Sequence, residues 1–363
     1  MRVSLSCRPV DQLSTILLDI LLPILLMVGL GAVLRWKFEM DLGTLSKLNI
    51  YLFTPAFIFD KIAHSKLAWG DMGGIVLITV TQVATLGLLI WGIGLALKIS
   101  RKTLAAIALA VMFYNSGNYG LPLAELAYPT GAAASKTEKA TDSASTRLAA
   151  PLAGRGPGAS QTKDGGAVQA FVVLSQNVLL FTVGLTVAAG ASAGDFKEVL
   201  GKLFKLPVLY TLCVALSARY WLGGDPSRHL PVFIEKSCTY LSAGLVPIAL
   251  VTLGVQLAGN PRWPRWKPVS LVLLLRLVFG PIQMAGLLLA FHWTGWKPVQ
   301  LWPWPAELLI LTASVPTAIN TLLLTIELDG DADLAADCVF WTTMISCVSI
   351  FAWLVVIKTW WFV

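Results

Sequence analysis

Residues 113–123 read F-Y-N-S-G-N-Y-G-L-P-L and carry the strongest structural signal in the chain. They lie within a segment, Thr103–Ala124, that contains no charged residue, and an uncharged apolar segment of about 18 residues or more is typical of a transmembrane helix. Two asparagines, two glycines and a proline are costly in a helix that faces lipid, because proline removes a backbone donor and glycine loosens the helix. The segment therefore predicts a broken transmembrane helix whose unwound residues face protein or a water-filled cavity.

The rest of the chain has the composition of a membrane protein. Of its 363 residues, 56% are hydrophobic and 13% are charged, whereas a soluble chain has about 25% charged residues. This composition excludes a soluble enzyme, a nucleic-acid-binding protein and a fibrous protein. The net charge of +7 comes from basic residues in short loops between the apolar segments. Long uncharged segments recur at Met72–Leu97, Gly165–Gly194, Ser237–Pro261, Leu308–Ile326 and Cys338–Ile357.

We predict an all-α polytopic membrane protein with about ten transmembrane helices. The prolines within these spans indicate a duplication, because those of the first half recur in the second half after 184, 192 and 194 residues. Each half has an odd number of spans, so the second half enters the membrane in the opposite sense, as in the inverted repeats of secondary transporters. The matching prolines are Pro23 and Pro207 in spans one and six, Pro55 and Pro247 in spans two and seven, and Pro122 and Pro316 in spans four and nine.

The predicted domain boundaries follow from this repeat. Residues 1–129 hold spans one to four and residues 167–192 hold span five, which together form the first five-helix repeat. Residues 193–363 form the second repeat, with spans six to ten. Between spans four and five, residues 130–166 are rich in Ala, Gly, Ser and Thr with scattered charges, a composition that predicts a disordered loop.

Span nine carries a second interrupted segment, A-S-V-P-T-A-I-N-T, at residues 313–321. Two broken helices that cross at the centre of the membrane would aim two half-helix amino termini at one site, which suits a small anion. The alternative is that both segments are proline kinks whose polar residues satisfy backbone groups. In span four the half-helix is expected to begin near Gly120. The predicted substrate-binding residues are Asn115, Gly117, Asn118, Gly120 and Pro122 in span four and Pro316, Thr317 and Asn320 in span nine.

Four strings of the sequence resemble the auxin efflux carrier family, which includes bacterial carboxylate carriers and the plant PIN-FORMED auxin carriers. They are N-S-G-N-Y-G-L-P-L at 115–123, L-N-I-Y-L-F-T-P-A-F-I-F at 48–59, G-L-V-P-I-A-L-V-T-L-G at 244–254 and V-P-T-A-I-N-T at 315–321. The resemblance covers nearly all of the chain except residues 130–166. It implies ten helices in two inverted repeats, a mobile transport domain that moves against a scaffold, and a small organic anion as substrate. A homodimer would be ordinary for this resemblance.

The resemblance also bears on single residues. Asn115 and Pro122 match the fourth-span crossover of the family, and Pro316 matches the ninth. Asn320 matches an asparagine that is common in bacterial members, whereas the plant proteins differ there. The chain therefore resembles the bacterial type, and auxin itself is disfavoured as a substrate.

Two charged residues have open roles. Arg276 lies within span eight, and an intramembrane arginine is a candidate countercharge for an anion; alternatively its long side chain reaches back toward Arg265 and Lys267 at the interface. Glu125 follows the crossover and is either a site for a coupling proton or an interfacial carboxylate. Gln176 and Asn177 in span five are interpreted mainly as interhelical hydrogen-bonding residues. The histidines do not cluster, so no metal site and no cofactor is predicted.

These features predict a secondary transporter that moves a small organic anion by alternating access, driven by a gradient because no ATP-binding G-x-x-x-x-G-K-[ST] motif is present. A cation/proton antiporter or ion-coupled symporter of similar architecture is the alternative within transport, but antiport needs carboxylates at mid-membrane. A receptor or sensor remains open, since a binding site without transport has the same sequence. Catalysis is disfavoured. The protein is expected in the plasma or inner membrane with both termini outside. In that orientation the inside loops hold 12 bases and the outside holds 9, when the five bases of residues 130–166 and Arg276 are left out of the count.

Overall fold

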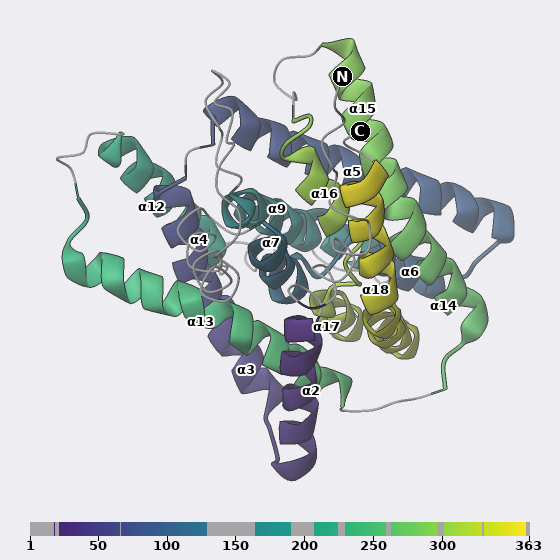
Figure 1. Cartoon of the computed structure of the whole chain (residues 1–363). Helices are drawn as coiled ribbons and strands as arrows, with labels where there is room; N and C mark the ends of the chain where they lie inside the picture. The colour runs from purple at the N-terminus through teal and green to yellow at the C-terminus, as the bar shows by residue number, and fades with distance from the viewer. Residues whose placement is uncertain are drawn as a thin grey trace, which may run out of the picture.

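The computed structural model describes residues 18, 22–65, 67–128, 164–189, 207–223, 229–258, 263–295, 301–328 and 330–360, which are almost entirely helical (Figure 1). Single π-helical turns join α3 to α4 (Asn49–Phe53), precede α7 (Ser116–Gly120), and join α9 to α10 (Leu180–Gly184) and α14 to α15 (Leu274–Phe279). The helices are α2 (Leu22–Lys37), α3 (Leu42–Leu48), α4 (Thr54–Ala63), α5 (Trp69–Leu97), α6 (Arg101–Met112), α7 (Leu121–Ala127), α9 (Gly165–Leu179), α10 (Leu185–Ala189), α12 (Pro207–Leu222), α13 (Val232–Leu257), α14 (Trp266–Leu273), α15 (Gly280–Thr294), α16 (Ala306–Thr312), α17 (Ile319–Glu327) and α18 (Ala332–Trp360).

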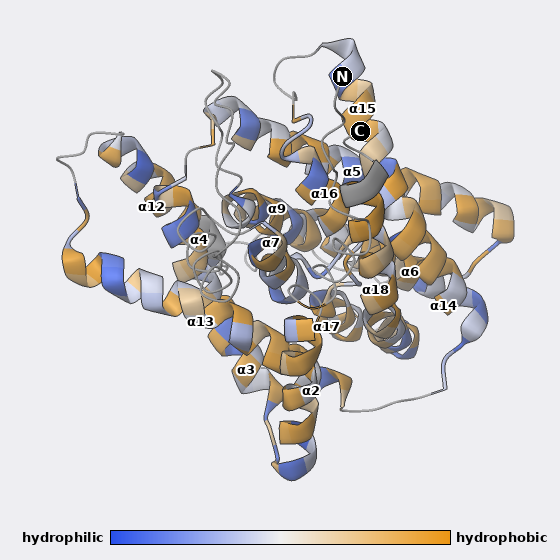
Figure 2. Ribbon diagram, viewed as in Figure 1, coloured by the Kyte–Doolittle hydropathy of each residue, from blue (hydrophilic) through white to orange (hydrophobic). Residues whose placement is uncertain are grey.

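The helices have the length and composition of membrane spans. Figure 2 shows hydrophobic residues along most of α5 and α6 and hydrophilic residues where α2 leads into α3. Within the described ranges, five segments are long and apolar enough to cross a bilayer, and together they confirm an integral, helical membrane protein. The ten-span count and the inverted repeat stay predictions. The five segments are Trp69–Leu97, Gly165–Ala188, Val232–Leu257, Trp266–Thr294 and Ala332–Ile357.

Helices α2, α3, α4, α12 and α13 form one group, which we call the panel. Within it α13 packs against α2 and α4, and α12 packs against α4. Two glycines make the crossing of α2 and α13 unusually close. A Cβ atom at Gly31 would lie 2.2 Å from the carbonyl oxygen of Val251, and one at Gly254 would lie 2.0 Å from that of Val28. Small residues let membrane helices approach until their backbones touch, so these glycines fix how the panel is packed.

The remaining helices form a second group around two breaks, which we call the crossover group. Helix α6 ends at Met112, residues 113–115 are not helical, and the chain resumes as helix at Ser116. In the same way residues 313–318 separate α16 from α17. The two interruptions predicted around Pro122 and Pro316 are therefore present, while their numbering as spans four and nine stays a prediction.

The two breaks pair with each other through their backbones. Tyr114 and Thr317 form an antiparallel β-bridge. In it the amide of Asn115 donates to the carbonyl of Pro316 at 2.8 Å, and the amide of Ala318 donates to the carbonyl of Phe113 at 3.1 Å. Unpaired backbone groups inside a membrane are costly. Through this bridge, backbone groups of each break form hydrogen bonds with those of the other.

Helix α7 begins at Leu121, next to the expected start near Gly120, but the helix itself resumes earlier, with the π-helical turn at Ser116–Gly120. The side chain of Asn115 caps it by accepting the amide of Asn118 at 3.1 Å. Pro122 then lies inside a helix that runs on from Ser116, and the π-helical turn before it accommodates the missing N–H group. An asparagine N-cap, rather than the proline, sets where this half-helix begins.

The predicted loop at 130–166 differs from the structure at its end. Residues 130–163 lie outside the described residues, but Gly165 and Gly166 form the first turn of α9, capped by Asp164. Both glycines are in close contact with α7 and its end: a Cβ atom would lie 2.6 Å from the carbonyl oxygen of Ala124 at Gly165, and 2.0 Å from Oε1 of Glu125 at Gly166. These glycines are needed for helix packing, although the sequence around them has the composition of a loop.

An ion pair and a hydrogen bond to the same carboxylate hold the ends of three helices of the crossover group together, and both charged residues lie just outside the apolar segments that begin at Trp266 and Ala332. Arg265, at the start of α14, donates to Asp331, which precedes α18, at 2.6 and 3.1 Å, and the Thr103 hydroxyl of α6 donates to the same carboxylate at 3.3 Å. Burial raises the pKa of Asp331, but the hydrogen bonds from Arg265 and from the Leu334 amide outweigh it and hold that pKa below its usual value. The carboxylate is thus kept ionised and the ends of the helices are held together.

Candidate functional site

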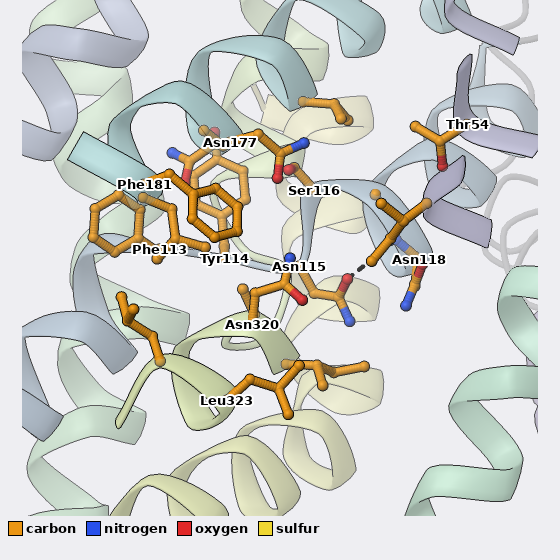
Figure 3. A pocket seen from close by; sticks show the side chains of 18 of the residues that line it. Thr54, Phe113, Tyr114, Asn115, Ser116, Asn118, Asn177, Phe181, Asn320 and Leu323 are labelled. Atoms are coloured by element: carbon orange, nitrogen blue, oxygen red, sulfur yellow. Dashed lines mark hydrogen bonds between the residues drawn. The ribbon is translucent and has the colours of Figure 1, made fainter. Parts of the chain in front are cut away.

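A cavity of about 270 Å³ lies at the crossing of the two breaks (Figure 3). Its walls come from both groups of helices, because the π-helical turn at Asn49–Phe53 and the start of α4 contribute Ile50, Tyr51 and Thr54 to the lining. The lining residues are Ile50, Tyr51, Thr54, Phe113, Tyr114, Asn115, Ser116, Gly117, Asn118, Val173, Gln176, Asn177, Leu180, Phe181, Ala318, Ile319, Asn320, Leu323 and Leu324.

One part of the cavity wall consists of amides with unused hydrogen-bonding atoms. Asn115 is 6% exposed, and while its oxygen caps the half-helix, its Nδ2 donor is buried without a partner. Gln176 is 3% exposed, and both its Nε2 and its Oε1 atoms are buried without a hydrogen-bond partner. A buried polar group left unsatisfied costs about 1–3 kcal/mol, so these groups are arranged to meet a polar ligand or water.

Further amides and an apolar wall complete the site. Asn118 and Asn320 line the cavity, and Nδ2 of the buried Asn49 lies 3.5 Å from Oδ1 of Asn118. Figure 3 shows Phe113, Tyr114 and Phe181 together on the side of Asn115 that lies away from Asn118. The cavity therefore offers hydrogen-bond donors to a polar head and ring surfaces to an apolar body.

None of the residues that line the cavity is charged. The positive ends of two helices lie there instead: the helix that resumes at Ser116 and helix α17, which begins at Ile319. Each helix amino terminus carries the equivalent of about half a positive charge. The field in the cavity therefore favours an anion over a cation.

The predicted substrate-binding residues divide into two sets. Asn115, Gly117, Asn118 and Asn320 line the cavity. The other four do not line the cavity: Gly120, Pro122, Pro316 and Thr317. Two of these hold the crossover together instead. The carbonyl of Pro316 accepts from the amide of Asn115, and the Thr317 hydroxyl donates to the carbonyl of Ala110 at 2.8 Å.

Gln169 is a bracing residue that sequence reasoning missed. Its side chain is fully buried in α9, donates to the carbonyl of Ser116 at 2.8 Å and accepts from the Thr312 hydroxyl at 2.8 Å. It therefore links the two broken helices from a third. Its position gave a usable signal, because Gln169 and Gln176 are seven residues apart and face the same side of a helix.

Gly120→Ala is expected to disrupt this link. The new Cβ atom would lie 2.4 Å from Nε2 of Gln169, whose amide is held at both ends and cannot easily turn away. We expect a loss of about 2 kcal/mol in stability, measured as a fall in Tm of the purified protein. Gly117→Ala is the control, since no atom lies within 4 Å of a Cβ there. Equal Tm values for the two variants would contradict this role of Gln169.

Arg276 and Glu125 lie away from the cavity lining. The expectation that Arg276 reaches back to the interface is wrong, because its side chain is fully buried and donates to the carbonyls of Val111, at 2.8 Å, and Ala313. Glu125 forms an ion pair at 2.9 Å with Lys61 of α4, so it joins the crossover group to the panel. Gln176 and Asn177, which the sequence suggested as interhelical hydrogen-bonding residues, line the cavity instead.

The fold and the site define a helical membrane protein with an uncharged cavity, lined by amides and apolar side chains, where two broken helices cross. The family model described as "Membrane transport protein" matches residues 16–197 and 197–354. The chain therefore belongs to this family of membrane transport proteins, the auxin efflux carrier family that the sequence resembles.

Two archaeal relatives agree with this assignment. An "Uncharacterized transporter" of Methanothermobacter thermautotrophicus is 26% identical over 353 residues, which cover 93% of this chain and 98% of that protein. A second "Uncharacterized transporter", from Methanocaldococcus jannaschii, is 26% identical over 175 residues, which cover 47% of this chain and 52% of that protein. Both are similar to this chain in sequence, and both are named as transporters.

Proposed function

We propose that this protein is a secondary transporter that carries a small organic anion, a carboxylate, across the membrane by alternating access. The observation that carries the proposal is the Nδ2 donor of Asn115, which is buried, unpartnered and part of the lining of an uncharged cavity. A carboxylate oxygen accepts such a donor strongly, since hydrogen bonds to charged groups are worth about 1.5–3 kcal/mol. The neighbouring helix amino termini add their field to this bond.

The size and walls of the cavity limit the substrate. A volume of about 270 Å³ holds a small molecule. The amides of Asn115, Gln176 and Asn320 would bind the carboxylate, and Phe113 and Phe181 would contact the rest of the molecule. No carboxylate lines the cavity, so nothing in the lining favours the cation/proton antiporter that was the alternative.

The contacts between helices support an inverted repeat. If the second half repeats the first, α12 corresponds to α2 and α13 to α4. The contact of α2 with α13 then recurs as the contact of α12 with α4, and both are present. Likewise the contact of α5 with α9 recurs as that of α14 with α18. In this proposal the panel is the scaffold and the crossover group carries the cavity past it.

The test is solute flux in proteoliposomes. Radiolabelled mono- and dicarboxylates, together with a cation and a neutral sugar, are offered to vesicles that contain the purified protein. Saturable uptake of a carboxylate supports the proposal. A folded protein that binds a carboxylate without moving it would be a receptor or sensor, and uptake of the cation alone would overturn the proposal.

Gln176→Leu is expected to lower carboxylate uptake about 10- to 100-fold, because the substrate loses one hydrogen bond to a charged group. The change keeps the volume of the side chain and removes a buried polar group that lacks a good partner, so stability should not fall. Ser175→Ala is the matched control: the Ser175 hydroxyl donates to the carbonyl of Phe171 in its own helix, and it does not line the cavity. Equal uptake rates for the two variants would count against the site.

A further inference from the structure

Arg276 is a buried cation whose partners in the described residues are two backbone carbonyls and one aromatic ring. Its Nη1 donates to Val111 in the last turn of α6, and its Nη2 donates to Ala313 at the end of α16. Its Cζ atom lies 4.7 Å from the centre of the Tyr114 ring. One side chain therefore contacts both breaks of the crossover, which lie about two hundred residues apart in sequence.

Both carbonyls are at the carboxyl-terminal ends of half-helices. Such an end carries the equivalent of about half a negative charge, so two of them together balance one guanidinium. The four helix ends at the crossover therefore have different surroundings. Arg276 neutralises the two negative ends, and the two positive ends are left at the cavity.

We infer that Arg276 is the positioning residue of the crossover, which holds the two breaks in register by closing the carboxyl-terminal ends of α6 and α16 together. It does not line the cavity, so its role in the crossover needs no contact with a substrate. A lysine supplies the charge as a single point, whereas the planar guanidinium can reach two carbonyls at once. The consequence for transport rests on the proposed function, but the consequence for the crossover does not.

Gly280 supplies the room for this contact. A Cβ atom at Gly280 would lie 3.2 Å from Nη2 of Arg276 and 3.3 Å from the carbonyl oxygen of Ala313. Those two atoms are hydrogen-bonded to each other, so neither can give way without weakening the contact. Gly280→Ala therefore perturbs the same contact while Arg276 itself is unchanged.

Hydrogen–deuterium exchange measured by mass spectrometry tests the inference without any substrate. The reporters are the amides of Asn115 and Ala318, which form the bridge between the breaks. In Arg276→Met we expect both amides to exchange at least about tenfold faster than in the unmodified protein. Arg276→Lys should give a smaller increase at both, and so should Gly280→Ala, which remains informative if Arg276→Met does not fold.

Arg219 offers a matched control. It is also an arginine within a helix, donates to the carbonyl of Leu67, and its Cζ lies 4.8 Å from the centre of the Trp69 ring. Arg219→Met should leave exchange at Asn115 and Ala318 unchanged. Unchanged exchange in Arg276→Met, or faster exchange at one break alone, would overturn the inference.

Flux separates this inference from the proposed function. If the unmodified protein transports a carboxylate, Arg276→Met should lose at least about 100-fold of the flux and Arg276→Lys should recover part of it, in parallel with exchange at the bridge. If exchange rises as expected while the unmodified protein moves no solute, the positioning role stands and the proposed transport fails. Full recovery of flux by lysine without recovery of exchange would assign Arg276 a countercharge role instead.

Discussion

Carboxylate uptake by Asn115→Asp in proteoliposomes is expected to be at least about 100-fold slower than uptake by the unmodified protein. The change replaces the free Nδ2 donor of the cavity by an oxygen that carries negative charge. Two negative charges about 4 Å apart repel each other by about 4 kcal/mol at the effective dielectric constant near a protein surface. Substrate binding would therefore weaken by several powers of ten before any other effect is counted.

The same variant should fold as well as the unmodified protein. Its carboxylate can still accept the amide of Asn118, as the amide oxygen of Asn115 does at 3.1 Å, and a negative charge is favourable at a helix amino terminus. Asn115→Ala provides the contrast, because it loses the cap and about 1 kcal/mol with it. Tm measured for both variants separates binding from folding. Uptake by Asn115→Asp within threefold of normal, at unchanged Tm, would remove Asn115 from the site.

Gly254→Val is expected to lower the stability of the protein by about 3 kcal/mol, with a fall of several degrees in Tm. A Cβ atom at this position would lie 2.0 Å from the carbonyl oxygen of Val28 and 2.9 Å from the amide nitrogen of Ala32. Both are backbone atoms of α2, so the clash cannot be relieved by turning a side chain. The two helices must move apart, and the packing along their crossing is lost.

Gly29→Val is the control for this change. It places the same β-branched residue in α2, at a position where no atom lies within 4 Å of the new Cβ. It should leave Tm nearly unchanged, and both variants should bind carboxylates normally in whatever fraction remains folded. Similar Tm values for the two variants would show that the close approach of α2 and α13 contributes little to stability.

The sequence predicted the class of structure well because lipid restricts what a chain can do. Uncharged segments and the polar break around Asn115 have few alternative explanations inside a membrane, and both broken helices are present. The half-helix was expected to begin near Gly120, beside Pro122, whereas the cap formed by Asn115 starts a π-helical turn several residues earlier. A local hydrogen bond of this kind is hard to distinguish from a proline effect by composition alone.

Other features depend on contacts between distant segments, which a single sequence does not reveal. Arg276 could be recognised as unusual, but its partners at Val111 and Ala313 become evident only when the helices are packed. Gln176 and Asn177 looked like ordinary interhelical residues, and only the packed structure shows that they line the cavity. The glycines at 165 and 166 were misjudged for the same reason, since their role lies in contact with α7 and the residues that follow it.

The bridge between Tyr114 and Thr317 also constrains how the protein can be made. Until residue 318 has been synthesised, the amide of Asn115 and the carbonyl of Phe113 lack the partners they have in the finished structure. An unpaired backbone group in a bilayer costs several kcal/mol, so a nascent first half would hold its fourth span in a conformation it cannot keep. The cavity therefore forms late, after the second half of the chain has been inserted and the backbone bridge between the two breaks has formed.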